Sequence, residues 1–380
     1  MHRWPVLALA GLLTFPAPLP AVAAPAAPRL PAPTGSDTVG TTSLYLKDTS
    51  RRDPWVPTAT SRELMVSLWY PAVKPRQGHR AQYVTPKESE LLVKDAGLPG
   101  VAPDMLSKVR TNAYADAAPA SRKGGLPLVV LSPGLGSPRS SLTSLAEDLA
   151  SRGNVVVGID HTYESVATAF PDGRVATCVA CGNKDPDLGQ KVVRSRAADV
   201  SFVLDQLTGS KPKWQGAALI DRSRIGMAGQ SVGGASSIAA MVKDTRIRAG
   251  VNLDGSTFAP IPKDGLSQPF LFVGTAEMHS PGGKDGSWAR DWEKLTGWKR
   301  WLVVTGAEHA SFTDVPMLAE QIGIDLGFSM TGVRSVEITR AYVAAFFARH
   351  LSARPQPLLD KPSARYPEVT FCSVRIKQCR

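Results

Sequence analysis

The sequence predicts an α/β fold in which a mostly parallel central sheet is covered by helices on both faces. Short, almost continuously apolar segments recur along the chain, as they do in strands that are buried on both sides. Segments with apolar residues at helical spacing lie between most of these segments. Strands that alternate with helices favour parallel pairing, because each helix provides the crossover to the next strand.

The apolar segments of strand length define the expected sheet. These segments comprise residues 44–46, 65–70, 128–131, 154–159, 225–228, 249–253, 270–273 and 301–304. The expected helices comprise residues 141–151, 196–207, 234–242 and 335–351. In the first of these helices Leu142, Leu145 and Leu149 fall on one face, which predicts a helix packed against the sheet.

The N-terminal residues have the composition of a targeting segment. Two polar residues precede a mostly apolar stretch at 4–15, and the small residues at 21–23 provide a cleavage site. We therefore expect a secretory signal peptide at 1–23 and an extracellular protein. The apolar stretch is too short to span a bilayer. Residues 24–34 are rich in proline and alanine and predict an extended linker that lies outside the fold.

The remaining residues, 35–380, suit one large domain with an ample core. Within this domain, residues 78–123 are polar and mixed in composition, with two short helical patterns and no convincing strand. This segment is interpreted as a cap-like insertion near the functional site.

The four cysteines form two local pairs, Cys178 with Cys181 and Cys372 with Cys379. In an oxidising compartment, two short-loop disulfides are the favoured one of three connectivities. The alternative for Cys178 and Cys181 is a redox or zinc motif. However, no helix of thioredoxin type follows, and no histidine ligand is nearby. Neither a metal ion nor a cofactor is expected.

The chain is basic, with 44 Lys and Arg against 33 Asp and Glu and a net charge of +11. The basic residues are scattered in ones and twos rather than gathered in runs, which is typical of a solvated cationic surface. A more specific interpretation of the positive charge is peripheral contact with an anionic lipid surface. Nucleic-acid binding has little support.

One pentapeptide carries the chemical interpretation. Residues 229–233 read Gly-Gln-Ser-Val-Gly, between an apolar strand and a helix of small residues. This arrangement is typical of a nucleophile elbow, in which a tight turn exposes a serine above the sheet while the two glycines let the neighbouring chains pass closely. Ser231 is therefore the candidate nucleophile.

A serine hydroxyl needs a base, and the base needs an acid that fixes its tautomer. His309 lies in the loop after the last apolar strand, where a base is expected, and His279 is the reserve candidate. Asp254 ends the strand that follows the elbow, and it is favoured as the acid. Glu277, after the next strand, is its rival. His161 precedes the serine in the chain and is interpreted as a pocket-wall or structural residue.

An oxyanion requires two preorganised N–H donors. The amide of Val232, directly after the candidate nucleophile, is the first one expected. The second is the amide of Leu135, which lies in the Ser-Pro-Gly-Leu-Gly loop at 132–136. Glycines on both sides of Leu135 let the backbone approach a substrate carbonyl.

Taken together, these motifs resemble the platelet-activating-factor acetylhydrolase family of α/β-hydrolases, which includes secreted bacterial lipases and esterases. The resemblance covers most of the chain and rests on residues 68–72, 132–136, 160–161, 229–234, 253–255 and 309–312. It implies an α/β-hydrolase fold with Ser231 as nucleophile, Asp254 as acid, His309 as base and Leu135 as an oxyanion donor. Gln230 departs from the histidine that relatives often carry there, which weakens the argument for a phospholipid substrate.

We therefore expect a secreted serine ester hydrolase, a carboxylesterase or lipase that forms an acyl-enzyme on Ser231. Its substrate would be an ester or lipid, either a small molecule or a polymer, and the enzyme would be a monomer. Three alternatives remain: a polyester hydrolase of cutinase type, a non-catalytic binding protein with the same fold, and a serine peptidase or thioesterase.

Overall fold

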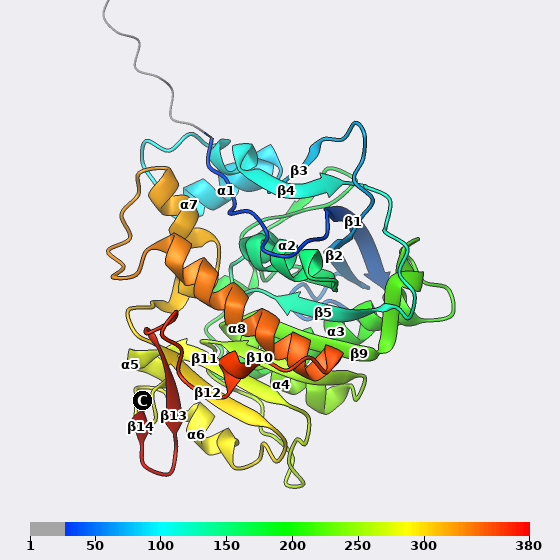
Figure 1. Cartoon of the computed structure of the whole chain (residues 1–380). Helices are drawn as coiled ribbons and strands as arrows, with labels where there is room; N and C mark the ends of the chain where they lie inside the picture. The colour runs from blue at the N-terminus through cyan, green and yellow to red at the C-terminus, as the bar shows by residue number, and fades with distance from the viewer. Residues whose placement is uncertain (1–26) are drawn as a thin grey trace, which may run out of the picture.

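The computed structural model describes residues 27–380, so the predicted signal peptide at 1–23 lies outside the described residues. Its main feature is a twelve-stranded sheet with the order β14-β13-β12-β11-β10-β9-β5-β6-β2-β1-β4-β3 (Figure 1). Helices cover both faces of this sheet, which confirms the predicted α/β architecture.

Six neighbouring strands form the parallel centre of the sheet. They are β5 (Leu126–Ser132), β6 (Val155–His161), β9 (Ile220–Gln230), β10 (Ile247–Leu253), β11 (Phe270–Thr275) and β12 (Lys299–Val304). Because they are parallel, their carboxyl ends all meet at one edge of the sheet, which is where ligands bind in open α/β sheets.

The flanks of the sheet are mainly antiparallel. They consist of β1 (Val39–Asp48), β2 (Arg62–Pro71), β3 (Arg80–Gln82), β4 (Arg110–Ala115), β13 (Val369–Ser373) and β14 (Gln378–Cys379). A separate two-stranded sheet pairs β7 (Thr168–Ala169) with β8 (Val175–Ala176). Each strand predicted from the sequence lies within or overlaps one of the observed strands.

Alternate residues of the central strands enter two different cores. In β5, Leu128 and Val130 pack with α3 (Leu188–Thr208) and α4 (Val232–Lys243) on one face. Val129 and Leu131 pack on the opposite face, with α2 (Thr143–Ser151) and α8 (Gly332–Ser352), which crosses the near side of the sheet in Figure 1. This division follows from the period of two along a strand.

Shorter helices and 3₁₀ turns lie mostly in the connections. The α-helices are α1 (Pro86–Asp95), α5 (Ala276–His279), α6 (Ser287–Trp292) and α7 (Val315–Gln321). The 3₁₀ turns are η1 (Met105–Lys108), η2 (Arg139–Leu142), η3 (Ala180–Gly182), η4 (Ala217–Leu219), η5 (His309–Phe312) and η6 (Pro357–Leu359). Among residues 27–380, no helix is long and apolar enough to cross a membrane.

The expectation that residues 24–34 lie outside the fold is wrong for the part of the segment that packs against the body. Leu30 is 3% exposed, and its amide donates to the carbonyl of Arg110 at 2.9 Å. The Arg340 guanidinium donates to the carbonyl oxygens of Pro31 and Ala32 at 3.1 and 3.0 Å. The proline-rich composition does give an extended chain, but backbone acceptors and one leucine anchor it.

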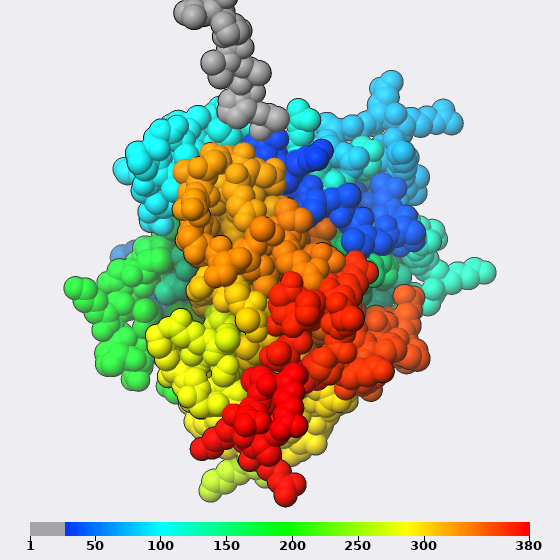
Figure 2. Space-filling view, turned by 60° about the vertical axis from the view of Figure 1, so that its left-hand side comes forward, coloured from blue at the N-terminus to red at the C-terminus, as the bar shows by residue number. Residues whose placement is uncertain are grey.

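The insertion at 78–123 contains α1, as its helical pattern predicted, but also the strands β3 and β4, which were not predicted. Both lie at the edge of the sheet, where polar residues are tolerated on the solvent side, so the apolar signal is weak. Figure 2 shows this insertion, in cyan, against the orange segment that contains α7.

The two predicted disulfides are present, one joining Cys178 to Cys181 and the other joining Cys372 to Cys379. The second one links β13 to β14 at the end of the sheet.

Candidate active site

Ser231 occupies the tight turn between β9 and α4, as the elbow pattern predicts. Its φ of 56° and ψ of −130° lie outside the regions that a non-glycine residue usually adopts. A side chain at Gly233 would overlap the carbonyl oxygen of Ser132, so only glycine allows this approach. The backbone amide of Ser231 donates to the carbonyl of Leu253 at 2.8 Å, which holds the turn against β10.

The register of the sheet places Asp254 beside Ser231. Gln230 at the end of β9 is paired with Leu253 at the end of β10, so the residue that follows each strand lies at the same edge. Asp254 also has a positive φ, 56°, and its side chain is 1% exposed. Asp254 therefore lies at the strand end beside Ser231, and its role as the acid stays a prediction.

His309, in η5, completes this group. Its Nδ1 lies 2.6 Å from Oδ2 of Asp254, and its carbonyl oxygen accepts a hydrogen bond from Nε2 of Gln230 at 3.0 Å. The imidazole is 57% exposed, so its other face is open to solvent and to a substrate. Gln230, which the sequence marked only as a departure from relatives, thus fixes the backbone of the histidine loop.

Asp254 is held in its ionised form. Burial alone would raise the pKa of its carboxyl group, but hydrogen bonds from His279, His309 and the amide of Thr275 hold that pKa well below its ordinary value. The Thr275 amide donates to Oδ1 at 2.7 Å. Oδ2 therefore accepts from the Nδ1–H of His309, and Nε2 is left as the ring's basic nitrogen.

The rival acid, Glu277, lies elsewhere. It is in α5 and forms an exposed ion pair with Lys284, with 64% of its side chain accessible. The carboxylate that contacts His309 belongs to Asp254 instead. His279, the reserve base, also contacts Asp254, through Nδ1 at 2.7 Å.

The two predicted oxyanion donors lie at the same edge. Val232 is the first residue of α4, where an amide has no partner within the helix. Leu135 lies in the turn after β5, and the neighbouring Gly136 amide is used elsewhere, in a 2.8 Å bond to the carbonyl of Glu164. In the described part of the chain, the amides of Leu135 and Val232 donate to no other residue.

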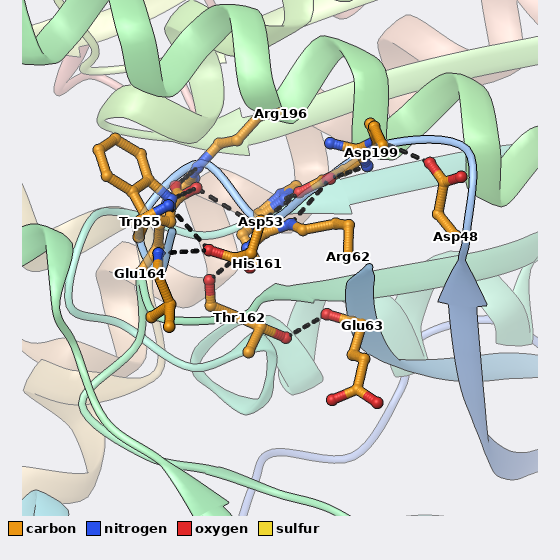
Figure 3. A network of polar contacts seen from close by, with 12 residues as sticks. Asp48, Asp53, Trp55, Arg62, Glu63, His161, Thr162, Glu164, Arg196 and Asp199 are labelled. Carbon is orange, nitrogen blue, oxygen red and sulfur yellow. Dashed lines mark hydrogen bonds and ion pairs between the residues drawn. The ribbon is translucent and has the colours of Figure 1, made fainter. Parts of the chain in front are cut away.

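A buried polar network, drawn in Figure 3, lies next to the loop at 132–136. At its centre is Arg62, which is 0% exposed. It contacts Asp53 at 2.7 Å, Asp199 at 2.9 Å and Glu164 at 3.4 Å, and it donates to the carbonyl of Thr162 at 2.6 Å. Three carboxylates therefore surround one guanidinium within the protein interior.

The network reaches the loop at 132–136, which carries the predicted oxyanion donor Leu135, through Arg196 of α3. Its Nε donates to Glu164 at 2.7 Å, while Nη1 donates to the Ser132 hydroxyl at 3.1 Å and to the carbonyl of Pro133. The Glu164 carbonyl also accepts a hydrogen bond from the Gly136 amide. Arg196 therefore holds the start of the loop, Glu164 holds its end, and the two residues are bonded to each other. These bonds preorganise the backbone on which the predicted oxyanion donor lies.

His161 belongs to this network and is a buried structural residue. Its Nδ1 lies 2.7 Å from Asp199, and its Nε2 lies 3.0 Å from the Ser132 hydroxyl. Burial and the nearby charge of Arg196 lower its pKa despite the carboxylate. A neutral ring then donates a hydrogen bond from Nδ1 to Asp199 and accepts one at Nε2 from the Ser132 hydroxyl.

Sequence reasoning missed Arg62, Glu164, Arg196 and Asp199. One signal was available in α3, where Arg196 and Asp199 fall within the apolar stripe of an otherwise amphipathic helix. A charged residue on the buried face of a helix requires a partner. Their partners lie in other elements, and no local pattern identifies them.

A cleft of about 840 Å³ adjoins the loop at 132–136. It is lined mainly by apolar side chains from the insertion and from α7, with Leu135 and Gly136 at its border. The lining includes Leu91, Leu92, Leu106, Leu318 and Ile322. The cleft reaches the candidate site only through the loop that carries Leu135, since Ser231, Asp254 and His309 are not part of its lining. Among the described residues, no cluster of His, Cys, Asp and Glu has the arrangement of a metal site.

Asp314, just after the histidine loop, yields a pH-dependent prediction. Burial raises the pKa of Asp314 to about 7, although the Ser144 amide donates to its carboxyl group. Between the unfolded pKa, about 4, and pH 7, the folded state keeps a proton that the unfolded chain loses, so this group lowers stability as pH rises. Asp314→Asn should therefore gain roughly 2–4 kcal/mol relative to wild type by pH 8 and little at pH 4.

Urea unfolding at both pH values measures this effect, with Asp325→Asn, at an exposed carboxylate, as the control. A stability difference for Asp314→Asn that stays constant between pH 4 and pH 8 would contradict the assignment.

With the fold and site described, comparison with known proteins becomes informative. The model of the family described as platelet-activating factor acetylhydrolase, isoform II, matches residues 24–177 and 190–355. The chain belongs to this family. The family resemblance inferred from the motifs is therefore confirmed.

Individual relatives are esterases by name. The enzyme is 28% identical to a probable 1-alkyl-2-acetylglycerophosphocholine esterase of Arthroderma benhamiae over 379 residues, which covers 90% of this chain and 93% of the relative. It is 26% identical to the platelet-activating factor acetylhydrolase of Cavia porcellus across 228 residues, which covers 50% of this chain and 48% of that protein.

Among solved structures, a ferulic acid esterase from Streptomyces cinnamoneus superposes with a TM-score of 0.81 and 44% identity. The match covers 92% of this chain and 100% of that one. The enzyme is thus a carboxylic ester hydrolase with the α/β-hydrolase fold.

Proposed function

We propose that the enzyme is a secreted serine esterase in which Ser231 is the nucleophile, His309 the base and Asp254 the acid. The observation that supports this most directly is the 2.6 Å contact between Asp254 and His309 at the edge where the strained turn presents Ser231. The three residue types occur in the chain order serine, acid, histidine that is usual for this architecture.

In this proposal, the Ser231 hydroxyl oxygen attacks the ester carbonyl carbon while its proton passes to Nε2 of His309. The negative charge that forms on the carbonyl oxygen is stabilised by the amides of Val232 and Leu135. Asp254 stabilises the imidazolium. The alkoxide leaves with the proton from His309, and an acyl-serine ester remains. Water then attacks this ester with His309 as base, which releases the acid and restores the hydroxyl.

For the substrate, we propose an ester of an aromatic acid. The relative with the higher identity over nearly the whole chain, at 44%, is named as a ferulic acid esterase. An apolar cleft beside Leu135 suits a planar, largely apolar acyl group. The second candidate is an acetyl ester of an alkylglycerophosphocholine, supported by the family model and by the relative at 28% identity.

Secretion is part of the same proposal. The N-terminal composition resembles a signal peptide, and two disulfides are typical of proteins that mature in an oxidising compartment. We further propose that the enzyme acts as a monomer. Its net charge of +11 would favour contact with anionic lipid surfaces.

A two-part experiment tests the proposal. A fluorophosphonate probe should label the protein covalently at Ser231, and peptide mapping should locate the adduct. A panel of substrates then ranks methyl ferulate, acetyl esters, an alkylacetylglycerophosphocholine and a polyester film by kcat/KM or release rate. We expect methyl ferulate to rank first. Absence of labelling on folded protein would favour a non-catalytic role. Preference for the phospholipid or the film would reject the aromatic substrate but not the mechanism.

A further inference from the structure

Asp254 has a second imidazole partner besides His309. Its Oδ1 lies 2.7 Å from Nδ1 of His279, the last residue of α5, and Nε2 of the same ring lies 3.0 Å from Oδ2 of Asp285. The ring is 1% exposed and stacks on the indole of Trp288, with 4.1 Å between centroids and 18° between planes. His279 is thus enclosed between two carboxylates and an aromatic face.

This geometry determines the charge of His279. Ionised carboxylates only accept hydrogen bonds, and a neutral imidazole has a single N–H. Bonds from both nitrogens to Asp254 and Asp285 therefore require both nitrogens to carry protons. Burial lowers the pKa of His279, but its bonds to the two carboxylates raise it above the ordinary value overall. The same ring lowers the pKa of Asp285 against the effect of its burial.

The other charged groups around His279 are already paired. On α6, Arg290 bonds to Asp291 at 2.7 Å, and on α5 itself Glu277 pairs with Lys284. The charges that face the His279 ring directly are therefore those of Asp254 and Asp285.

We propose that His279 is a positioning residue for ester hydrolysis, a buried imidazolium that fixes the carboxylate of Asp254 so that Oδ2 faces His309. This inference rests on the proposed function. The Thr275 amide and His279 both occupy Oδ1 at 2.7 Å, so the carboxylate cannot rotate without losing two bonds. His279 adds what the backbone amide lacks, a full positive charge next to the acid.

That charge affects His309 as well. A cation beside Asp254 makes the carboxylate a weaker hydrogen-bond acceptor and disfavours a second cation on His309. In a variant without the charge, this repulsion between two neighbouring cations is absent, so the protonated form of His309 is favoured relative to wild type. The acid limb of the kcat/KM profile then moves to higher pH, because a larger fraction of the base is blocked at any given pH.

Two variants separate the hydrogen bond from the charge. His279→Gln removes the charge and the ring, whereas Asp285→Asn keeps the ring and its bond to Asp254 but removes the carboxylate that helps to keep it protonated. His350→Gln is the matched control, because the His350 ring packs at a tilt against Trp298 and Phe346, which belong to the core on the other face of the sheet. All are compared with wild type as full-length mature protein.

For His279→Gln, we expect kcat/KM for a soluble ester to fall about 10- to 100-fold, with most of the loss in kcat, as for a misaligned base. Its acid limb should move up by roughly 0.5–1 pH unit, and that of Asp285→Asn should move in the same direction by less. His350→Gln should keep the wild-type profile. In wild type, ¹⁵N NMR should show both nitrogens of His279 protonated at pH 8.

Fluorophosphonate labelling of wild type separates this inference from the proposed function, since failure to label Ser231 would reject the function itself. If labelling succeeds, a folded His279→Gln variant with wild-type kcat/KM and an unmoved acid limb would overturn the positioning role. If that variant does not fold, an unchanged profile in Asp285→Asn, or an unprotonated His279 nitrogen at pH 8, would overturn it equally.

Discussion

Replacing Ser231 with alanine should lower ester hydrolysis by about 10⁴-fold or more while leaving the fold intact. The hydroxyl is the only protein group that forms a covalent bond with the substrate in the proposed reaction. The amide of Ser231, which bonds to Leu253, is kept in the variant, so the turn retains its main support. Turnover of methyl ferulate and of a p-nitrophenyl ester, with thermal unfolding in parallel, measures the effect.

The control for this variant is Ser223→Ala, an exposed position near the start of the same strand, where activity should not change. Near-normal esterase activity in folded Ser231→Ala would mean that another residue is the nucleophile. A loss of activity accompanied by unfolding would instead mean that the strained turn had not tolerated the change.

Arg62→Met should produce the largest loss of stability, about 3–5 kcal/mol. The guanidinium is fully buried between the carboxylates of Asp53, Glu164 and Asp199. Its removal leaves the buried Asp53 without an ion-pair partner, and it leaves Glu164 and Asp199 with only Arg196 and Arg51 as cationic neighbours besides His161. The control is Arg174→Met, because Arg174 pairs with Glu63 and Asp172 at the surface. This substitution should change the free energy of unfolding by less than about 1 kcal/mol. Urea unfolding at neutral pH measures both.

The effect of Arg62→Met should depend on pH in a defined direction. Burial acts to raise the pKa of Asp199, but Arg62 and His161 hold it well below the ordinary value. A lowered folded pKa stabilises the protein above the unfolded pKa, about 4, and this contribution disappears as pH falls through the folded value. Without Arg62 the pKa of Asp199 in the folded state rises. The loss of unfolding free energy in the variant should therefore be greatest near pH 7 and smaller at pH 4.5. A deficit that grows on acidification would contradict this account.

The sequence predicted the central strands because each of them carries its own apolar signal. It also placed Ser231, Asp254 and His309 at one edge, because all three follow strands of a parallel sheet, where topology brings carboxyl ends together. The roles proposed for them remain predictions to be tested by the variants above.

Other features could not be predicted, for reasons that differ. Strand β4 is polar and lies near an edge, where alternation is weak. Residues 31 and 32 are held by Arg340 through their carbonyl oxygens, which every residue has, so their side chains do not reveal the contact. The pairing of Arg62 with Asp199 joins residues 137 positions apart. His279 was noted as a spare base, but its contact with the far side of Asp254 depends on how α5 follows β11, which periodicity does not specify.

The borders of the central sheet bear on the behaviour of the protein at high concentration. One border ends in β3, with three residues, and the other in β14, with two residues joined to β13 by a disulfide. A border this short offers few free backbone donors and acceptors to a strand from another molecule. The twelve-stranded sheet is therefore a poor template for the addition of a strand from another molecule. This property suits the proposed secreted enzyme, which would have to stay dispersed without chaperones.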